Sequence, residues 1–142
     1  MEKKTSSINP EFIISFFLPD GMIDWFEVVK ITEESNSGEA KVDVLFDSIL
    51  NIYLDERDNR EGEQPGLKPN GFTEPTVIKD YPIRNRKVLL HVRRRRYQDA
   101  DGRNIILNHY PLTADGTKVT VEFGAFFKDG DGHLAIDSDS DR

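Results

Sequence analysis

The chain contains no cysteine among its 142 residues. Disulfide bonds and zinc sites with thiolate ligands are therefore excluded, because both need cysteine sulfur. The chain also lacks a hydrophobic run of the roughly 18–20 residues that cross a bilayer, since its longest candidate, residues 12–18, is interrupted by Ser15 and stops at Pro19. The N-terminal residues lack the hydrophobic segment of a signal peptide, so we expect a cytoplasmic location without membrane contact.

Sequence motifs of known catalytic and cofactor sites are missing as well. There is no GxSxG nucleophile elbow, no cysteine nucleophile, no HExxH, and no phosphate-binding loop of the GxxxxGKS/T or GxGxxG type. The 26 acidic residues show no spacing that singles out a pair for two-metal phosphoryl transfer. We therefore expect no enzymatic activity, no cofactor and no small-molecule substrate.

The metal-binding patterns are incomplete. His91, His109 and His133 are far apart in the sequence, although a hairpin centred on residues 100–101 would bring the first two to opposite positions. A histidine pair without a third ligand is a weak metal site, so packing or solvent contact is the better interpretation. The acidic run at residues 129–137 resembles the start of a calcium loop but lacks the required glycine and the final glutamate. We expect no metal site.

Local patterns predict one α+β domain over residues 8–128, between a flexible N-terminus (1–7) and an acidic flexible tail (129–142). We expect a small antiparallel sheet with a projecting basic β-hairpin and two or three short helices. Asn9 and Pro10 begin a helix, in which the phenylalanines and isoleucine at 12, 13, 16 and 17 should bury one face. A second short helix follows Asp20. Strands are expected at 28–31, 42–54, 76–81, 86–97 and 104–112, with a turn at 36–38, an exposed loop at 56–71 and a hairpin turn at 99–102. Residues 117–127 fit either a strand or a helix face.

The charge of the chain is unevenly distributed. Residues 79–97, KDYPIRNRKVLLHVRRRRY, carry a formal charge of +7 in a chain of net charge −7, so the remaining residues carry −14. Such a basic element implies an anionic partner, most plausibly a nucleic-acid backbone, although a salt-bridged strand is the simpler alternative. Strand alternation places Arg93 and Arg95 on one face and Arg94 and Arg96 on the other. The four arginines could act together only on an exposed ribbon, whose arginine-bearing end would project into solvent.

Four blocks of the chain, in order, are similar to a known family. They are FLPDGMIDWFEVVKITEE, IYLDER, GFTEPTVIKDYPIRNRKVLLHVRRRRY and GTKVTVEFGAFFKDGDG. Together they resemble the N-terminal-region protein of a group of bacterial insertion-sequence transposases, in which a separate reading frame encodes the catalytic transposase. The middle block also resembles the zinc ribbon of related transposases, here without any cysteine. The resemblance implies a metal-free ribbon, a helix at 117–127, and a non-catalytic part in transposition.

Two functional hypotheses follow for this chain. In the first, it is an accessory DNA-binding subunit that contacts the DNA of the element ends. In the second, it is a protein-interaction module whose basic ribbon docks on the catalytic transposase subunit without direct DNA contact, which the acidic remainder of the chain favours. The DNA-contact set of the first hypothesis is Arg84, Arg86, Lys87, Arg93, Arg94, Arg95, Arg96 and Arg103.

Overall fold

The computed structural model describes residues 9–35, 46–114 and 117–129, which form three short helices and two β-sheets. The α+β class is confirmed. The elements are α1 (Pro10–Ser15), α2 (Met22–Trp25), β1 (Phe26–Ser35), β2 (Ser48–Glu56), β3 (Lys68–Phe72), β4 (Thr76–Ile83), β5 (Arg86–Arg93), β6 (Arg95–Gln98), β7 (Asn104–Ile105) and α3 (Val121–Asp129). The expected flexible N-terminus and the turn at 36–38 lie outside the described residues, as does the acidic tail beyond Asp129.

The larger sheet has four strands in the order β1-β2-β5-β4. The outer pairs, β1–β2 and β4–β5, are antiparallel, but the central pair β2–β5 is parallel. The expectation of a purely antiparallel sheet is wrong at this pair, because residues 57–85 form the long crossover connection that parallel strands need. An alternating apolar pattern does not distinguish the two directions, since side chains alternate between faces in both.

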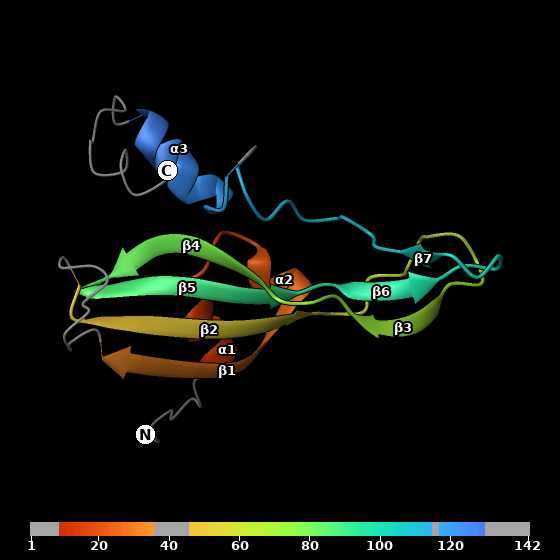
Figure 1. Ribbon diagram of the computed structural model, residues 1–142, viewed down its shortest axis with the longest axis horizontal. Coiled ribbons are helices and arrows are strands. Elements are labelled where there is room, and N and C mark those ends of the chain that lie inside the picture. The colour runs from red at the N-terminus through yellow and green to blue at the C-terminus, as the bar shows by residue number, and fades with distance from the viewer. Residues whose placement is uncertain (1–8, 36–45, 115–116, 130–142) are drawn as a thin grey trace, which may run out of the picture.

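The second sheet, β3-β6-β7, extends from one end of the first (Figure 1). Strand β5 leads into β6 with only Arg94 between them, so the chain passes from one sheet directly into the other. The projecting hairpin is present. Its turn begins at Asp99 and returns through Gly102, whose φ of 85° is the left-handed conformation that glycine adopts readily. The return strand is only Asn104–Ile105, and the predicted loop at 56–71 already contains most of β3.

The hydrophobic core lies between the α1–α2 region and one face of the four-stranded sheet. Figure 1 shows both helices behind this sheet. Leu18, Met22 and Phe26 pack against six sheet residues that are 2% exposed or less, namely Ile52, Leu54, Ile78, Val88, Leu90 and Val92. We call this side of the sheet the inner face.

The N-terminal helix begins where the sequence predicts but buries other residues. The Asn9 side chain accepts a hydrogen bond from the Glu11 backbone N–H (2.9 Å), and Pro10 is the first helical residue. The expectation that residues 12, 13, 16 and 17 bury one face is wrong, since all four are exposed, Phe16 by as much as 68%. The helix ends after six residues, and Ile14, on its other face, is the residue that packs on the core.

Helix α3 lies beside the β4 edge of the sheet (Figure 1). The helix expected within residues 117–127 is therefore present, and it begins at Val121. The Thr120 hydroxyl donates to Asp80 Oδ1 (2.8 Å), and the Tyr81 hydroxyl donates to the Glu122 carbonyl (3.0 Å). Burial raises the pKa of the Asp80 carboxyl, and the nearby Glu122 adds to this effect, against the Thr120 hydrogen bond. A buried carboxylate therefore lies under the attachment of α3.

This carboxylate gives a pH-dependent prediction for Asp80→Asn. Because the folded-state pKa of Asp80 lies above the ordinary 3.8, the parent chain gains stability as pH falls through that pKa, and loses it as pH rises. Asparagine keeps an acceptor for Thr120 and does not titrate. We expect the variant to melt at or above the parent temperature at pH 7, with its advantage shrinking toward pH 4. Thermal melts at both pH values test this, with the exposed Asp101→Asn as control. An advantage that grows on acidification would contradict it.

Candidate nucleic-acid interface

The arginine run lies at the junction of the two sheets, not at the tip of the hairpin (Figure 1). Arg93 ends β5, and Arg95 begins β6. The expectation that the arginine-bearing end projects into solvent is therefore wrong. The residues that project furthest belong to the turn at Asp99–Arg103, and the arginines occupy the base of the projection, where carboxylates and carbonyls of other strands reach them.

Arg94 forms the most buried ion pair of the described chain. Its Nη1 atom lies 2.8 Å from Glu56 Oε2, and the two side chains are 15% and 1% exposed. Its Nη2 atom donates to the Tyr110 carbonyl (2.6 Å), and its guanidinium lies 5.6 Å from the centre of the Phe26 ring. Burial raises the pKa of Glu56, opposed by the Arg95 N–H and by Arg94. The guanidinium of Arg94 is thus occupied by partners within the protein.

Arg95 and Arg96 also form hydrogen bonds with other strands of the protein. The Arg95 backbone N–H and its Nε atom donate to Glu56 Oε1 and to the Glu56 carbonyl, both at 2.8 Å. Arg96 Nε donates to the Asn70 carbonyl on β3 (3.2 Å). Both arginines are half-buried. They join β6 to the end of β2 and to the neighbouring strand β3.

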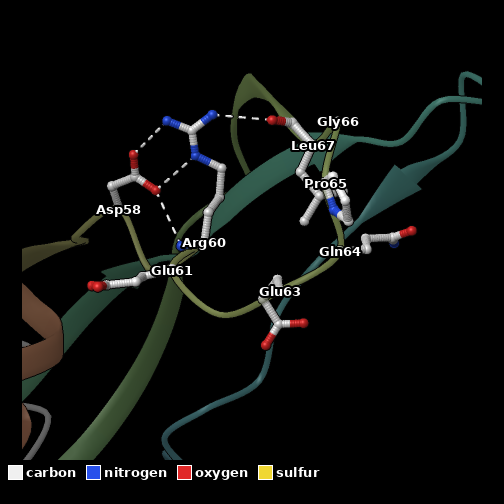
Figure 2. A pocket seen from close by; sticks show the side chains of 8 residues that line it. All are labelled: Asp58, Arg60, Glu61, Glu63, Gln64, Pro65, Gly66 and Leu67. Atoms are coloured by element: carbon white, nitrogen blue, oxygen red, sulfur yellow. Dashed lines mark hydrogen bonds and ion pairs between the residues drawn. The ribbon is translucent and has the colours of Figure 1, made fainter.

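The aromatic residue after the arginines completes this junction. Tyr97 is fully buried, and its hydroxyl accepts from the Asn59 backbone N–H (3.1 Å) and lies 3.0 Å from Asp58 Oδ1. Hydrogen bonds from Arg60 lower the pKa of Asp58 to about 2. Asp58 and Arg60 line a crevice of about 530 Å³ in the loop before β3. Figure 2 shows the lining side chains and the hydrogen bonds between these two residues. Arg60 is bound by Asp58 and by the Leu67 carbonyl, and the other lining charges are acidic, so this crevice does not suit an anion.

The remaining predicted contact residues are spread along the molecule. Arg84 is exposed in the turn between β4 and β5, with φ of 60°. Arg86 pairs with Glu33 (2.8 Å), whereas Lys87 lies on the opposite face of β5. Arg103 is 74% exposed at the far tip, where it pairs with Asp101. The structure does not bring the eight predicted residues together into one patch.

A second surface, which the sequence did not indicate, is the outer face of the four-stranded sheet. We define it as the face opposite α1 and α2. No described element lies in front of it in Figure 1. Residues in register on neighbouring strands share a face, so one row across this surface runs from Lys30 through Tyr53 and His91 to Val77. The rows on either side add Thr32, Asn51, Leu89 and Lys79, then Glu34, Ile49 and Lys87, and toward the second sheet Glu27, Asp55 and Arg93.

The centre of the outer face is a stack of aromatic rings under a cation. The rings of Tyr53 and His91 lie 4.3 Å apart at an angle of 18°, and Lys30 Nζ lies 4.7 Å from the centre of the Tyr53 ring. The Asn51 Nδ2 atom donates to Glu34 (2.8 Å). The Asn51 Oδ1 atom is therefore the acceptor for His91 Nε2 (2.7 Å). Burial lowers the pKa of His91, so the ring is neutral at neutral pH. The two stacked rings are uncharged, and Tyr53 lies between His91 on one neighbouring strand and Lys30 on the other.

A second cation–aromatic cluster adjoins the stack at the junction of the sheets. The guanidinium groups of Arg93 and Arg95 lie 4.5 and 4.9 Å from the centre of the Phe72 ring. Arg93 also forms two hydrogen bonds with Asp55, at 2.8 and 2.7 Å, yet 43% of its side chain remains exposed. A depression of about 310 Å³ lies beside both clusters, lined by Val29, Lys30, Tyr53, Asp55, Pro75, His91 and Arg93.

The outer face carries a small excess of positive charge although the chain as a whole is acidic. Its cations are Lys30, Lys79, Lys87 and Arg93, and its carboxylates are those of Glu27, Glu34 and Asp55. A face with an excess of cations around aromatic rings can attract phosphate and stack planar groups. Only two members of the predicted contact set, Lys87 and Arg93, lie on this face.

The structure also separates the two histidines that a long hairpin would have paired. The His109 ring stacks on the Trp25 ring, with the ring centres 5.3 Å apart, and its Nε2 atom lies 3.1 Å from Glu63 Oε2. His91, in contrast, lies in the four-stranded sheet. Within the described ranges no group of three His, Asp or Glu side chains could hold a metal ion. Nor is any described helix long and apolar enough to cross a membrane. No protein-family model, curated protein or solved structure matches this chain.

Proposed function

We propose that this chain is a non-catalytic DNA-binding accessory subunit of an insertion-sequence transposase, and that it contacts the DNA of the element ends. The observation that carries the proposal is the outer face, where an excess of cations surrounds aromatic rings and no described element covers them. The contact set is revised accordingly to Lys30, Lys87 and Arg93. The arginines at 94–96 take the role of holding these strands in place.

The resemblance of the four sequence blocks supplies the biological context of this proposal. It implies that catalysis resides in a separate transposase subunit, which is the second expected partner. The proposal includes a cytoplasmic location, where the chain meets chromosomal DNA. It includes no cofactor and no small-molecule substrate.

Binding to duplex element-end DNA should depend steeply on salt. Each neutralised phosphate releases counterions, so three contacts give a slope of log affinity against log salt of about −3. Fluorescence anisotropy of labelled duplex at several salt concentrations measures this slope. Lys87→Ala combined with Lys30→Ala should reduce the slope by about 2.

A matched control keeps this test specific. Arg103→Ala removes an exposed cation at the far tip of the hairpin, outside the revised set, and should leave both affinity and slope unchanged. Absence of any binding at low salt would contradict the proposal. Equal losses from the Arg103 variant and the double variant would show attraction by charge alone and would remove the outer face as the site.

The second candidate function is a protein-interaction module that docks on the catalytic subunit. The exposed aromatic residues of the N-terminal segment favour this second function. Phe12, Phe16 and Phe17 are each at least half exposed, and the ring centres of Phe12 and Phe16 lie 5.0 Å apart. Clustered exposed aromatics are typical of binding hot spots. Co-purification of the two subunits without DNA, abolished by Phe12→Ser with Phe16→Ser but not by the Lys30 and Lys87 changes, would support this function over the first.

A further inference from the structure

The chemistry of the outer face distinguishes between forms of nucleic acid. The major groove of a duplex admits a helix or a two-stranded ribbon, so a flat four-stranded sheet face meets a duplex mainly at its backbone phosphates. Bases of a single strand, in contrast, stack on aromatic side chains carried by an open sheet, while cations hold the phosphates. The described residues of the outer face offer rings and cations together, with no projecting element between them.

We infer that the outer face binds single-stranded nucleic acid, with unpaired bases stacked at Tyr53, His91 and Phe72 and phosphates held by Lys30, Lys87 and Arg93. This inference rests on the proposed function and names the form of nucleic acid that the same site takes. Residues 87–93 of β5 span about 20 Å at the rise of a β-strand, enough for several stacked nucleotides.

The cations that now cover the rings mark where a base and its phosphate would lie. Lys30 Nζ lies over the Tyr53 ring, and the Arg93 and Arg95 guanidinium groups lie over Phe72. An exposed cation–π contact is weaker than a base stacked on the same ring. Lys30 is exposed on the edge strand β1, so its ammonium group can leave the ring for a phosphate as a base arrives. Lys30 thereby exchanges one favourable contact for another.

The depression beside the rings gives the base a place to enter. It has a volume of about 310 Å³, and its lining includes Tyr53, His91 and Pro75. Because His91 is fixed by Asn51 through Nε2, its ring stays parallel to Tyr53 and presents Nδ1 as a hydrogen-bond acceptor. The stack is therefore preorganised, and binding need not order it.

The test compares three probes of about twelve nucleotides by anisotropy at one salt concentration: oligo-dT, an oligomer of the same length with abasic sites, and a duplex. Stacking predicts that oligo-dT binds more tightly than the abasic oligomer. Tyr53→Ala should weaken oligo-dT binding by about 5- to 150-fold, and Tyr53→Phe, which keeps the ring, should restore it. Phe16→Ala, an exposed aromatic behind the sheet, is the matched control and should change nothing.

The outcomes separate this inference from the proposed function. Equal binding of oligo-dT and the abasic oligomer would show phosphate contact only and would overturn the inference. Tight duplex binding that is unaffected by Tyr53→Ala would overturn it too, while leaving the DNA-binding function in place. Binding of none of the three probes would overturn both. If Tyr53→Ala fails to fold, the abasic comparison and Tyr53→Phe still decide the matter.

Discussion

Replacing Arg94 with alanine is expected to destabilise the fold by about 3–5 kcal/mol, because it leaves a buried carboxylate without its counter-ion. Glu56 is 1% exposed, and Arg94 supplies the only guanidinium that contacts its carboxylate oxygens among the described residues. The Tyr110 carbonyl would lose its donor as well. Since single domains are stable by only about 5–15 kcal/mol, this loss approaches global unfolding. Urea denaturation followed by circular dichroism measures it.

Two further variants identify the cause of that loss. Arg93→Ala removes the neighbouring arginine, whose partner Asp55 is more exposed, and should cost at most about 1 kcal/mol. Arg94→Met combined with Glu56→Gln removes both charges while keeping an acceptor for the Arg95 N–H, and should recover much of the stability. If Arg93→Ala proved as damaging as Arg94→Ala, the burial difference between these two residues would not be the cause.

Replacing Leu90 with alanine is expected to cost about 2–5 kcal/mol, through lost burial and the cavity that remains. Leu90 is fully buried on the inner face, between Ile52 of β2 and Ile78 of β4. The measurement is the free energy of unfolding from urea titration, compared with that of the parent chain.

The adjacent residue provides a control of identical chemistry. Leu89 lies on the outer face and is half-buried, so Leu89→Ala should cost only about 1 kcal/mol. The comparison tests which face of β5 is covered. Equal losses at the two positions would mean that the outer face is covered as thoroughly as the inner face, which would also argue against its role as a binding surface.

Local signals in the sequence predict the elements well where the cause is local. Asn9 and Pro10 begin a helix because capping and the fixed proline φ act within one turn, and the structure places α1 there. The strand predicted at 86–97 follows from its Val, Leu and His content, although the structure divides it at Arg94 into β5 and β6. The hairpin turn follows from Asp101-Gly102. Burial of the α1 phenylalanines was predicted wrongly because periodicity does not show which side of a short helix meets the core.

The candidate surface could not be predicted, because it depends on register between distant strands. A regular strand would place Val28 and Lys30 on the same face. The bulge between them turns Val28 toward the core and brings Lys30 opposite Tyr53 on the outer face. His91 meets Tyr53 only because β2 and β5 pair in parallel, which no local pattern specifies.

The residues alone exclude thiolate chemistry, indicate an α+β fold, and concentrate positive charge in residues 79–97. What that charge does depends on the folded structure. Arg94 and Glu56 are 38 residues apart in the chain, and folding brings them within 2.8 Å in a nearly dry site. Desolvation then makes pairing obligatory for Arg94, whereas Lys30 and Arg93, on the solvent side of the same sheet, keep the exposure that a ligand needs.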